Sequence, residues 1–146
     1  MVTIIQSDVE VPAGSYGAFL EASSLPYRLV RLHAGDTLPQ AGELSHLIIL
    51  GGAMGVHDGE RFPFLLDLQR LMSEVVSQQI PLLGICLGGQ LLAHILGGRV
   101  TANCYGEKGS QEVELTPAGV ADPLFAGIPQ TFTTFQWHND SFEPPP

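Results

Sequence analysis

The sequence has few basic residues. Only six of its 146 residues are Lys or Arg, against fifteen Asp and Glu, and its formal net charge at pH 7 is −9. So few cations cannot neutralise a run of nucleic-acid phosphates, and no basic amphipathic segment is present that would bind an anionic membrane surface. We therefore expect neither a nucleic-acid partner nor a membrane partner.

Long apolar stretches and cysteines are also scarce. The opening residues, MVTIIQ, lack the positive flank and the long apolar run of a signal peptide or membrane anchor. Two cysteines, Cys86 and Cys104, are too few for a disulfide framework. These features favour a reduced thiol and a cytoplasmic location. With 45% hydrophobic residues, the chain is long enough and apolar enough for one folded domain.

Apolar runs alternate with segments of helical periodicity. We expect strands at residues 2–6, 27–32, 44–50 and 80–85, helices at 16–22 and 64–79, and shorter strands at 111–115 and 130–137. The run at 44–50 is almost unbroken, which is typical of a parallel strand that is buried on both faces. The sequence therefore predicts an α/β fold in which a layered, mostly parallel sheet carries helices on both faces.

Cys86 lies where the pattern changes from strand to helix. The apolar run 80–85 ends at this cysteine, and helical periodicity begins at Leu87. Gly84 and Gly88 flank it in the spacing of a Gly-x-nucleophile-x-Gly elbow. A helix N-terminus favours negative charge, and the next backbone N–H points to where an oxyanion would form. The alternative is a buried structural cysteine behind a glycine-rich turn. The elbow spacing favours a nucleophile.

An ordered set of motifs resembles the class I glutamine amidotransferases, in their GMP synthase-like branch. LGGAMGV at 50–56 is similar to the family's Gly-Gly-Pro-Met loop, RFPFL at 61–65 to its Tyr-Pro-Trp-Leu helix entry, and LGICLGGQLLA at 83–93 to its nucleophile motif. LGGRV at 96–100, ELT at 114–116, DPLF at 122–125 and QWHND at 136–140 resemble later blocks. The resemblance implies a flavodoxin-like fold and a single amidotransferase domain over residues 1–146.

The resemblance also implies a reaction. Cys86 would attack the side-chain amide of glutamine and release ammonia, and water would then hydrolyse the glutamyl thioester. The N–H groups of Gly52 and Leu87 would form the oxyanion hole. Four residues would hold the substrate glutamine: Gly51, Met54, Gln90 and His138. The ammonia would pass to a synthetase domain or partner, and no cofactor is implied. Five histidines are present, but none pairs with another at metal-ligand spacing, so no metal site is expected.

Two departures from the family pattern change this expectation. Gly89 replaces the His of the family's Cys-Leu-Gly-His-Gln motif, and we expect a modest effect because the nucleophile is kept. More seriously, the chain has no His-x-Glu anywhere, whereas the family draws its base and orienting carboxylate from a His-Pro-Glu motif. We therefore expect the domain to be truncated at its C-terminus, without its last strands and helix, and nearly inactive as it stands.

Several alternatives stay open at this point. The chain could be a catalytically inactive binding or regulatory module or a partial gene product, and an open sheet edge would then favour self-association. It could also be another cysteine-elbow hydrolase or peptidase, which would share the turn but not the later blocks. His138 and Asp140, spaced as residues on one strand face, could replace the missing base and carboxylate.

A first prediction concerns thiol reactivity. In the folded chain, iodoacetamide should label Cys86 faster than Cys104, because the elbow presents its thiol at a helix N-terminus that favours the thiolate. Peptide mass spectrometry after timed labelling measures both rates, and the urea-unfolded chain is the control, in which the two rates should converge. Equal or slower labelling of Cys86 in the folded chain would remove it as the nucleophile.

Overall fold

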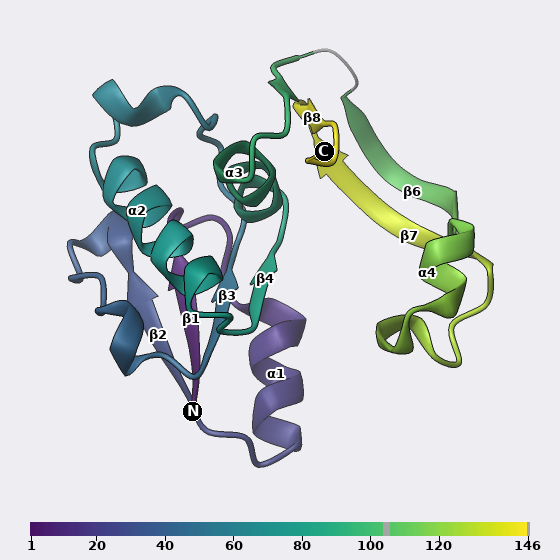
Figure 1. Ribbon diagram of the computed structural model, residues 1–146, viewed down its shortest axis with the longest axis horizontal. Helices are drawn as coiled ribbons and strands as arrows, with labels where there is room; N and C mark the ends of the chain where they lie inside the picture. Colours follow the sequence, from purple (N-terminus) through teal and green to yellow (C-terminus); the bar gives the residue numbers. More distant parts are fainter. Residues whose placement is uncertain (104–105, 146) are drawn as a thin grey trace.

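Four parallel strands form the central sheet of the protein. The structure is a computed structural model that describes residues 1–103 and 106–145. The strands β1 (Val2–Gln6), β2 (Tyr27–Arg31), β3 (His46–Ile49) and β4 (Leu82–Gly84) pair in the order β2-β1-β3-β4 (Figure 1). Each strand was expected from an apolar run, and the observed ends differ from the expected ends by at most two residues.

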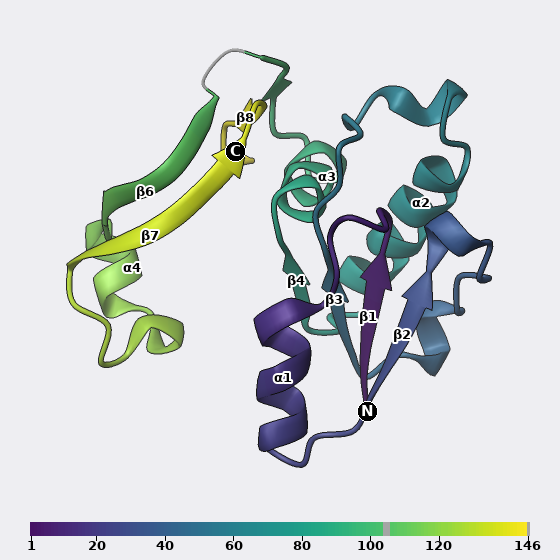
Figure 2. The ribbon, with the colours of Figure 1, turned by 180° about the vertical axis from the view of Figure 1, so that it is seen from behind.

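Helices cover both faces of this sheet, as the alternation of elements predicted. Helix α1 (Gly14–Ala22) packs on one face, while α2 (Phe64–Ser77) and α3 (Leu87–Ile95) pack on the other (Figure 2). Successive residues of β1 point to opposite faces. Ile5 accordingly joins the core under α2 and α3, whereas Ile4 joins the smaller core under α1. This is the flavodoxin-like layered arrangement that the class I amidotransferase resemblance implied.

Helix α2 shows how the sequence encodes these layers. Its apolar residues recur on one side, and the buried ones are Leu65, Leu68, Leu71, Met72 and Val75. The helix ends at Ser77, two residues before the expected end, and Gln79 then takes a positive φ of 56°. Pro81, two residues after Gln79, has no N–H to donate. Its carbonyl oxygen accepts the Leu47 N–H at 2.9 Å, and this hydrogen bond starts the pairing of β4 with β3.

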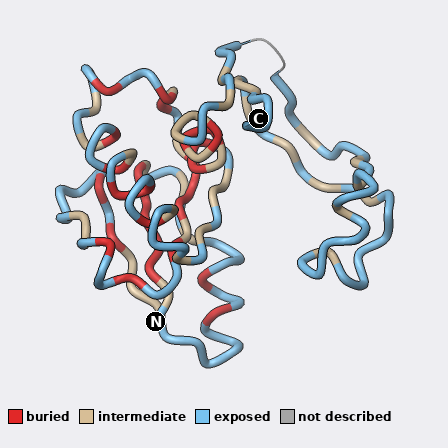
Figure 3. Tube along the Cα trace, in the orientation of Figure 1, coloured by how far each residue is buried: buried red, intermediate tan, exposed pale blue. Residues whose placement is uncertain are grey.

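The chain beyond α3 forms an extended arm beside the sheet. We use "the arm" for residues 107–138: β6 (Glu107–Glu114), α4 (Pro117–Ala121) and β7 (Thr131–His138), with β6 and β7 antiparallel (Figure 1). No residue of the arm is buried (Figure 3). Two short strands, β5 (Val100–Thr101) and β8 (Ser141–Phe142), pair with each other at its base. The described residues also contain short 3-10 helices, at Leu32–Ala34, Ala41–Glu43, Asp58–Glu60 and Pro123–Phe125.

The edge of the sheet at β4 is open. Among residues 1–103 and 106–145, no strand pairs with β4 on the side away from β3. Leu83 is 44% exposed, although its neighbour across the ladder, Ile48, is partly covered. An unpaired edge beside an exposed leucine is a surface on which another chain could add.

Within the same described ranges, no helix has the length and apolarity needed to cross a bilayer.

Helix α3 begins in close contact with β3. A Cβ added at Gly88 would overlap the Ile49 carbonyl oxygen, which is rigid backbone. At Gly89, the next residue of the same helix, an added Cβ would lie 3.3 Å from the Gly84 carbonyl oxygen, a tight contact without overlap. Gly88 therefore sets how closely the nucleophile-bearing turn approaches the sheet.

This contact gives a paired stability prediction. Gly88→Ala should lower the free energy of unfolding by about 1–3 kcal/mol relative to Gly89→Ala, because the added methyl group must push α3 away from β3. Both variants gain the same helix propensity, so their difference isolates the steric effect. Urea unfolding followed by circular dichroism measures both. Equal stability of the two variants would show that α3 is free to shift.

Candidate functional site

Cys86 occupies a strained turn between β4 and α3. Its φ and ψ are 53° and −112°, a backbone conformation that non-glycine residues rarely adopt and that costs about 1–3 kcal/mol. Three backbone hydrogen bonds of 2.9 Å hold the turn: Ile85 N–H to Ile49 O, Gly88 N–H to Ile85 O, and Gln90 N–H to Cys86 O. The turn leaves the Cys86 thiol exposed, 3.9 Å from the Trp137 carbonyl oxygen.

The two glycines around Cys86 allow this turn to close. A Cβ on Gly84 would overlap the Gly88 carbonyl oxygen, so the last residue of β4 and the first turn of α3 touch through bare backbone. This is the geometric reason for a glycine two residues before and two residues after the nucleophile. The elbow geometry is thus present as the sequence pattern predicted.

The loop after β3 lies directly beside the elbow. A Cβ on Gly51 would lie 3.2 Å from the Cys86 Cβ and 3.6 Å from its Sγ, and one on Gly52 would lie 3.2 Å from Leu87 Cδ2. Within the described part of the chain, neither the Gly52 N–H nor the Leu87 N–H donates a hydrogen bond. The fold has therefore left two donors unused: one on Leu87, the residue after Cys86, and one on Gly52, the residue after the Gly51 that faces the thiol.

These elements surround a pocket of about 580 Å³. Its walls come from the loop after β1, the loop after β3, the elbow, and the turn after β7. The lining residues are Asp8, Glu10, Val11, Pro12, Gly51, Gly52, Ala53, Met54, Ile85, Cys86, Gln90, Trp137, His138, Asn139 and Asp140. Six of the seven residues expected at the site are among them, and the seventh, Leu87, is fully buried behind the elbow. The size suits a small organic ligand.

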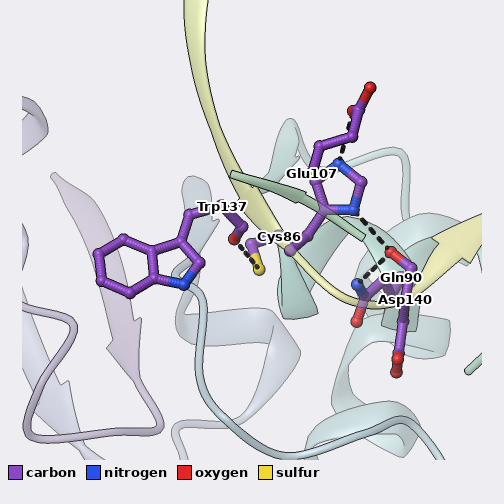
Figure 4. A network of polar contacts seen from close by, with 6 residues as sticks. Cys86, Gln90, Glu107, Trp137 and Asp140 are labelled. Carbon is purple, nitrogen blue, oxygen red and sulfur yellow. Dashed lines mark hydrogen bonds and ion pairs between the residues drawn. The ribbon is translucent and has the colours of Figure 1, made fainter. Parts of the chain in front are cut away.

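A chain of polar contacts joins the arm to α3 (Figure 4). The Asp140 carbonyl oxygen accepts the Gln90 Nε2–H at 3.2 Å and lies 3.0 Å from His138 Nδ1. The other ring nitrogen of His138, Nε2, lies 3.0 Å from Glu107 Oε2. Both partners of the ring are acceptors, so each ring nitrogen of His138 faces an acceptor oxygen.

Glu107 is the residue of this network that the sequence did not reveal. The alternative considered from sequence paired His138 with the Asp140 carboxylate, but that carboxylate accepts the Asn103 N–H at 3.0 Å. The atom of Asp140 that contacts the His138 ring is its carbonyl oxygen, 3.0 Å from Nδ1. Glu107 faces His138 because the β6–β7 register places them opposite each other. That register is hard to read from sequence because β6 has few apolar residues.

Two further histidines lie away from the pocket. His94 packs edge-on against His57, with ring centroids 5.1 Å apart, and neither lines the pocket. Cys104 lies outside the described residues. In the ranges that the structure describes, no three His, Cys, Asp or Glu side chains gather as metal ligands would. Trp137, in contrast, is 66% exposed at the pocket wall, with Lys108 Nζ 4.5 Å from its ring centre.

Comparison with known proteins identifies the family. The family model described as "Glutamine amidotransferase class-I" matches residues 20–146. The chain belongs to the class I glutamine amidotransferase family. Its resemblance to GMP synthases places it in the GMP synthase-like branch, as the sequence motifs indicated. The 98 residues that match the GMP synthase of Thermomicrobium roseum are 40% identical to it; they make up 66% of this chain and 16% of that protein.

Two further relatives extend the likeness to amidotransferases over most of the chain. The glutamine amidotransferase-like protein YfeJ of Salmonella typhimurium is 33% identical over 132 residues. These residues cover 88% of this chain and 55% of YfeJ, so the chain spans about half the length of that relative. A glutamine amidotransferase of Thermotoga maritima superposes with a TM-score of 0.90 at 32% identity, over 99% of this chain and 62% of its own.

The contact between Gln90 and Asp140 gives a pH-dependent prediction. Gln90 is only 5% exposed, so Gln90→Glu should cost about 1–3 kcal/mol at pH 8, where a buried carboxylate would face a carbonyl oxygen. Burial raises the folded-state pKa of the new carboxyl above its unfolded value of about 4.3. The deficit should therefore shrink as the pH falls below the folded pKa, where the acid can donate to Asp140, and grow again as the pH rises.

The control for this variant is Gln111→Glu. Gln111 is exposed on β6, and its side chain has no polar partner within the described ranges. Thermal unfolding of both variants from pH 4 to pH 8 separates the local effect from the overall change in charge. A pH-independent difference between the two variants would show that Gln90 does not face a carbonyl acceptor.

Proposed function

We propose that Cys86 performs the first half of a glutaminase reaction. The Cys86 thiolate forms a C–S bond to the side-chain amide carbon of glutamine, the C–N bond breaks, and ammonia leaves with a proton taken from solvent. A γ-glutamyl thioester remains on Cys86, and water hydrolyses it to glutamate. The observation that carries this proposal is the exposed Cys86 thiol on a strained elbow beside the Gly51–Gly52 loop.

The surroundings of the thiol support acyl transfer. Acylation creates an oxyanion, which needs two donors placed beside the attacked carbon. The N–H groups of Gly52 and Leu87 are the proposed donors, because both are near Cys86 and neither is used elsewhere in the described chain. Gly51, Met54, Gln90 and His138 are proposed to hold the substrate, since all four line the pocket.

Proton transfer is the weak part of the site. The sequence has no His-x-Glu. The histidine that lines the pocket, His138, has its ring nitrogens engaged by Glu107 and by the Asp140 carbonyl. General acid–base catalysis is typically worth about 10²–10⁴-fold in rate. Formation of the thioester on Cys86 and its hydrolysis should therefore both be slow, because acylation needs a proton for the leaving nitrogen and hydrolysis needs a base for the attacking water.

The proposed role of this reaction is to supply ammonia to a synthetase domain or partner. The relatives in the GMP synthase group are described as glutamine-hydrolysing, and the matched part is 16% of the Thermomicrobium roseum protein. The open edge at β4 and the exposed Leu83 offer a surface for such a partner, or for a second copy of this chain. We propose residues 1–146 as a single amidotransferase domain.

A second candidate function is an inactive binding or regulatory module. The observation that favours it is the engagement of both His138 ring nitrogens by protein acceptors, which leaves the pocket without a free imidazole. Such a module would bind glutamine in the same pocket without acylating Cys86.

Acyl-enzyme formation separates the two candidates. The chain is incubated with glutamine or with its γ-methyl ester, quenched in acid, and analysed by intact mass. The proposal expects a γ-glutamyl adduct on Cys86 with both compounds, forming faster with the ester because its leaving group needs less protonation. Cys86→Ala is the control and should show no adduct.

Two outcomes would contradict the proposal. If neither compound forms an adduct while iodoacetamide still labels Cys86, and glutamine binds Cys86→Ala by calorimetry, the chain is a binding module. If glutamine is hydrolysed rapidly over many turnovers and His138→Ala abolishes that turnover, His138 acts as the base, which contradicts a site whose histidine is engaged elsewhere.

A further inference from the structure

Asp8, two residues after β1, accepts a hydrogen bond from the loop that carries the proposed oxyanion donor. Its Oδ2 accepts the Ala53 N–H at 3.0 Å, across 45 residues of sequence. Its Oδ1 accepts the Glu10 N–H at 3.0 Å, and its carbonyl accepts Gln6 Nε2–H at 2.9 Å. The Gln6 side chain is only 5% exposed. Asp8 is therefore tied to the last residue of β1 and to its own loop, and it holds the loop after β3 through one carboxylate oxygen.

Gly52 is enclosed between Asp8 and the elbow. A Cβ added at Gly52 would lie 3.4 Å from Asp8 Cβ on one side and 3.2 Å from Leu87 Cδ2 on the other. Asp8 and Leu87 thus contact the same glycine from different elements, one after β1 and one after β4. A change at Asp8 acts directly on the position of Gly52 relative to Cys86.

The Asp8 contact also fixes the orientation of one peptide plane. The Gly52–Ala53 peptide is planar, so an Ala53 N–H that points to Asp8 directs the Gly52 carbonyl the opposite way. A hydrogen bond to a carboxylate is stronger than one between neutral groups. Glycine has the widest backbone freedom of any residue, and the Gly51-Gly52 pair has no side chain to restrict rotation. The contact from Asp8 supplies that restriction.

Ala53 stands where the family loop that this segment resembles carries proline. Proline fixes φ near −65° and has no N–H, so it restricts the loop without an outside acceptor. Alanine leaves φ free and leaves an N–H that needs a partner. Ala53 does not have a positive φ, so a proline is not excluded by backbone conformation here.

We infer that Asp8 is a positioning residue for the oxyanion hole. Its hydrogen bond from the Ala53 N–H restricts the loop after β3, as a proline at position 53 would restrict it. Asp8 lines the pocket, and the role inferred for it is to act through the Gly51–Gly52–Ala53 loop. This inference rests on the proposed function for its effect on catalysis, but the bond itself can be tested without any activity.

The inference predicts that the two positions are coupled. In Asp8→Ala, acylation of Cys86 by the γ-methyl ester of glutamine should fall about tenfold, because the loss of a whole oxyanion donor typically costs about 10²–10³-fold and a displaced donor costs less. Alkylation by iodoacetamide needs no oxyanion hole, so its rate should stay within about twofold. The ratio of the two rates separates loop position from thiol reactivity.

Ala53→Pro is expected to restore acylation that is lost in Asp8→Ala. In Ala53→Pro alone, the ring Cδ meets the Asp8 carboxylate, so acylation should fall. In the double variant Asp8→Ala with Ala53→Pro, the obstructing carboxylate is gone and the ring restrains the loop, so acylation should rise above that of either single variant. A role for Asp8 in overall stability alone would not give this rescue.

Asp58 provides a matched control. Its Oδ2 accepts the Gly55 N–H at 2.8 Å, so it is a second carboxylate bound to the backbone of the same loop, but it does not line the pocket. Asp58→Ala should leave the ratio of acylation to alkylation unchanged. An equal loss in Asp58→Ala and Asp8→Ala would show that general ordering of the loop, rather than the Asp8 bond, matters, and would overturn the inference.

Amide hydrogen exchange at Ala53 tests the bond independently of activity. The Ala53 N–H should exchange much faster in Asp8→Ala than in the unaltered chain, whereas the Gly55 N–H should not change. If the unaltered chain forms no acyl adduct, the proposed function fails while this exchange result still decides the bond. Unchanged exchange at Ala53, or no gain of acylation in the double variant over Asp8→Ala, would overturn the inference.

Discussion

The turn at Cys86 is the constraint on which the rest of the site depends. A non-glycine residue at φ 53° and ψ −112° is unfavourable by about 1–3 kcal/mol, so the fold must hold it in place. The close approach of α3 to β3 at Gly88, and of β4 to α3 at Gly84, does so through bare backbone contacts. The result is a thiol that projects into the pocket from a rigid layer, while Leu87 behind it is fully buried.

Two less rigid parts complete the pocket from either side. The loop after β3 is glycine-rich and takes its position from Asp8 and from the elbow. The arm has no buried residue, and the Gln90 side chain on α3 donates a hydrogen bond to the Asp140 carbonyl, just beyond the end of the arm (Figure 4). Segments with few buried apolar contacts open at low free energy. The nucleophile is therefore held firmly, whereas the groups that must meet the substrate are held by a few polar contacts.

The central sheet could be predicted well from the sequence because strands that are buried on both faces appear as nearly unbroken apolar runs. The runs at 44–50 and 80–85 and the periodicity at 64–79 led to β3, β4 and α2 with small errors at their ends. The arm was predicted less well: β6 begins at Glu107 rather than at 111, and β5 and β8 were missed. Strands that bury nothing leave little periodicity to read.

The same reason explains which site residues could be found. Cys86, Gly51 and Gln90 belong to motifs that are local in sequence, so their placement in one pocket followed from the parallel strand order. Glu107 and Asp8 were not found, because each meets its partner only through pairing over 31 and 45 residues. Composition and spacing carry no signal for such contacts.

A crystal structure of the Cys86→Ala chain with glutamine bound would test the central claim most directly. We predict that the side-chain amide carbon lies beside residue 86, with its carbonyl oxygen about 2.7–3.1 Å from the backbone nitrogens of Gly52 and Leu87. Glutamine bound outside this pocket, or bound with its carbonyl turned toward the arm and both nitrogens unused, would contradict it.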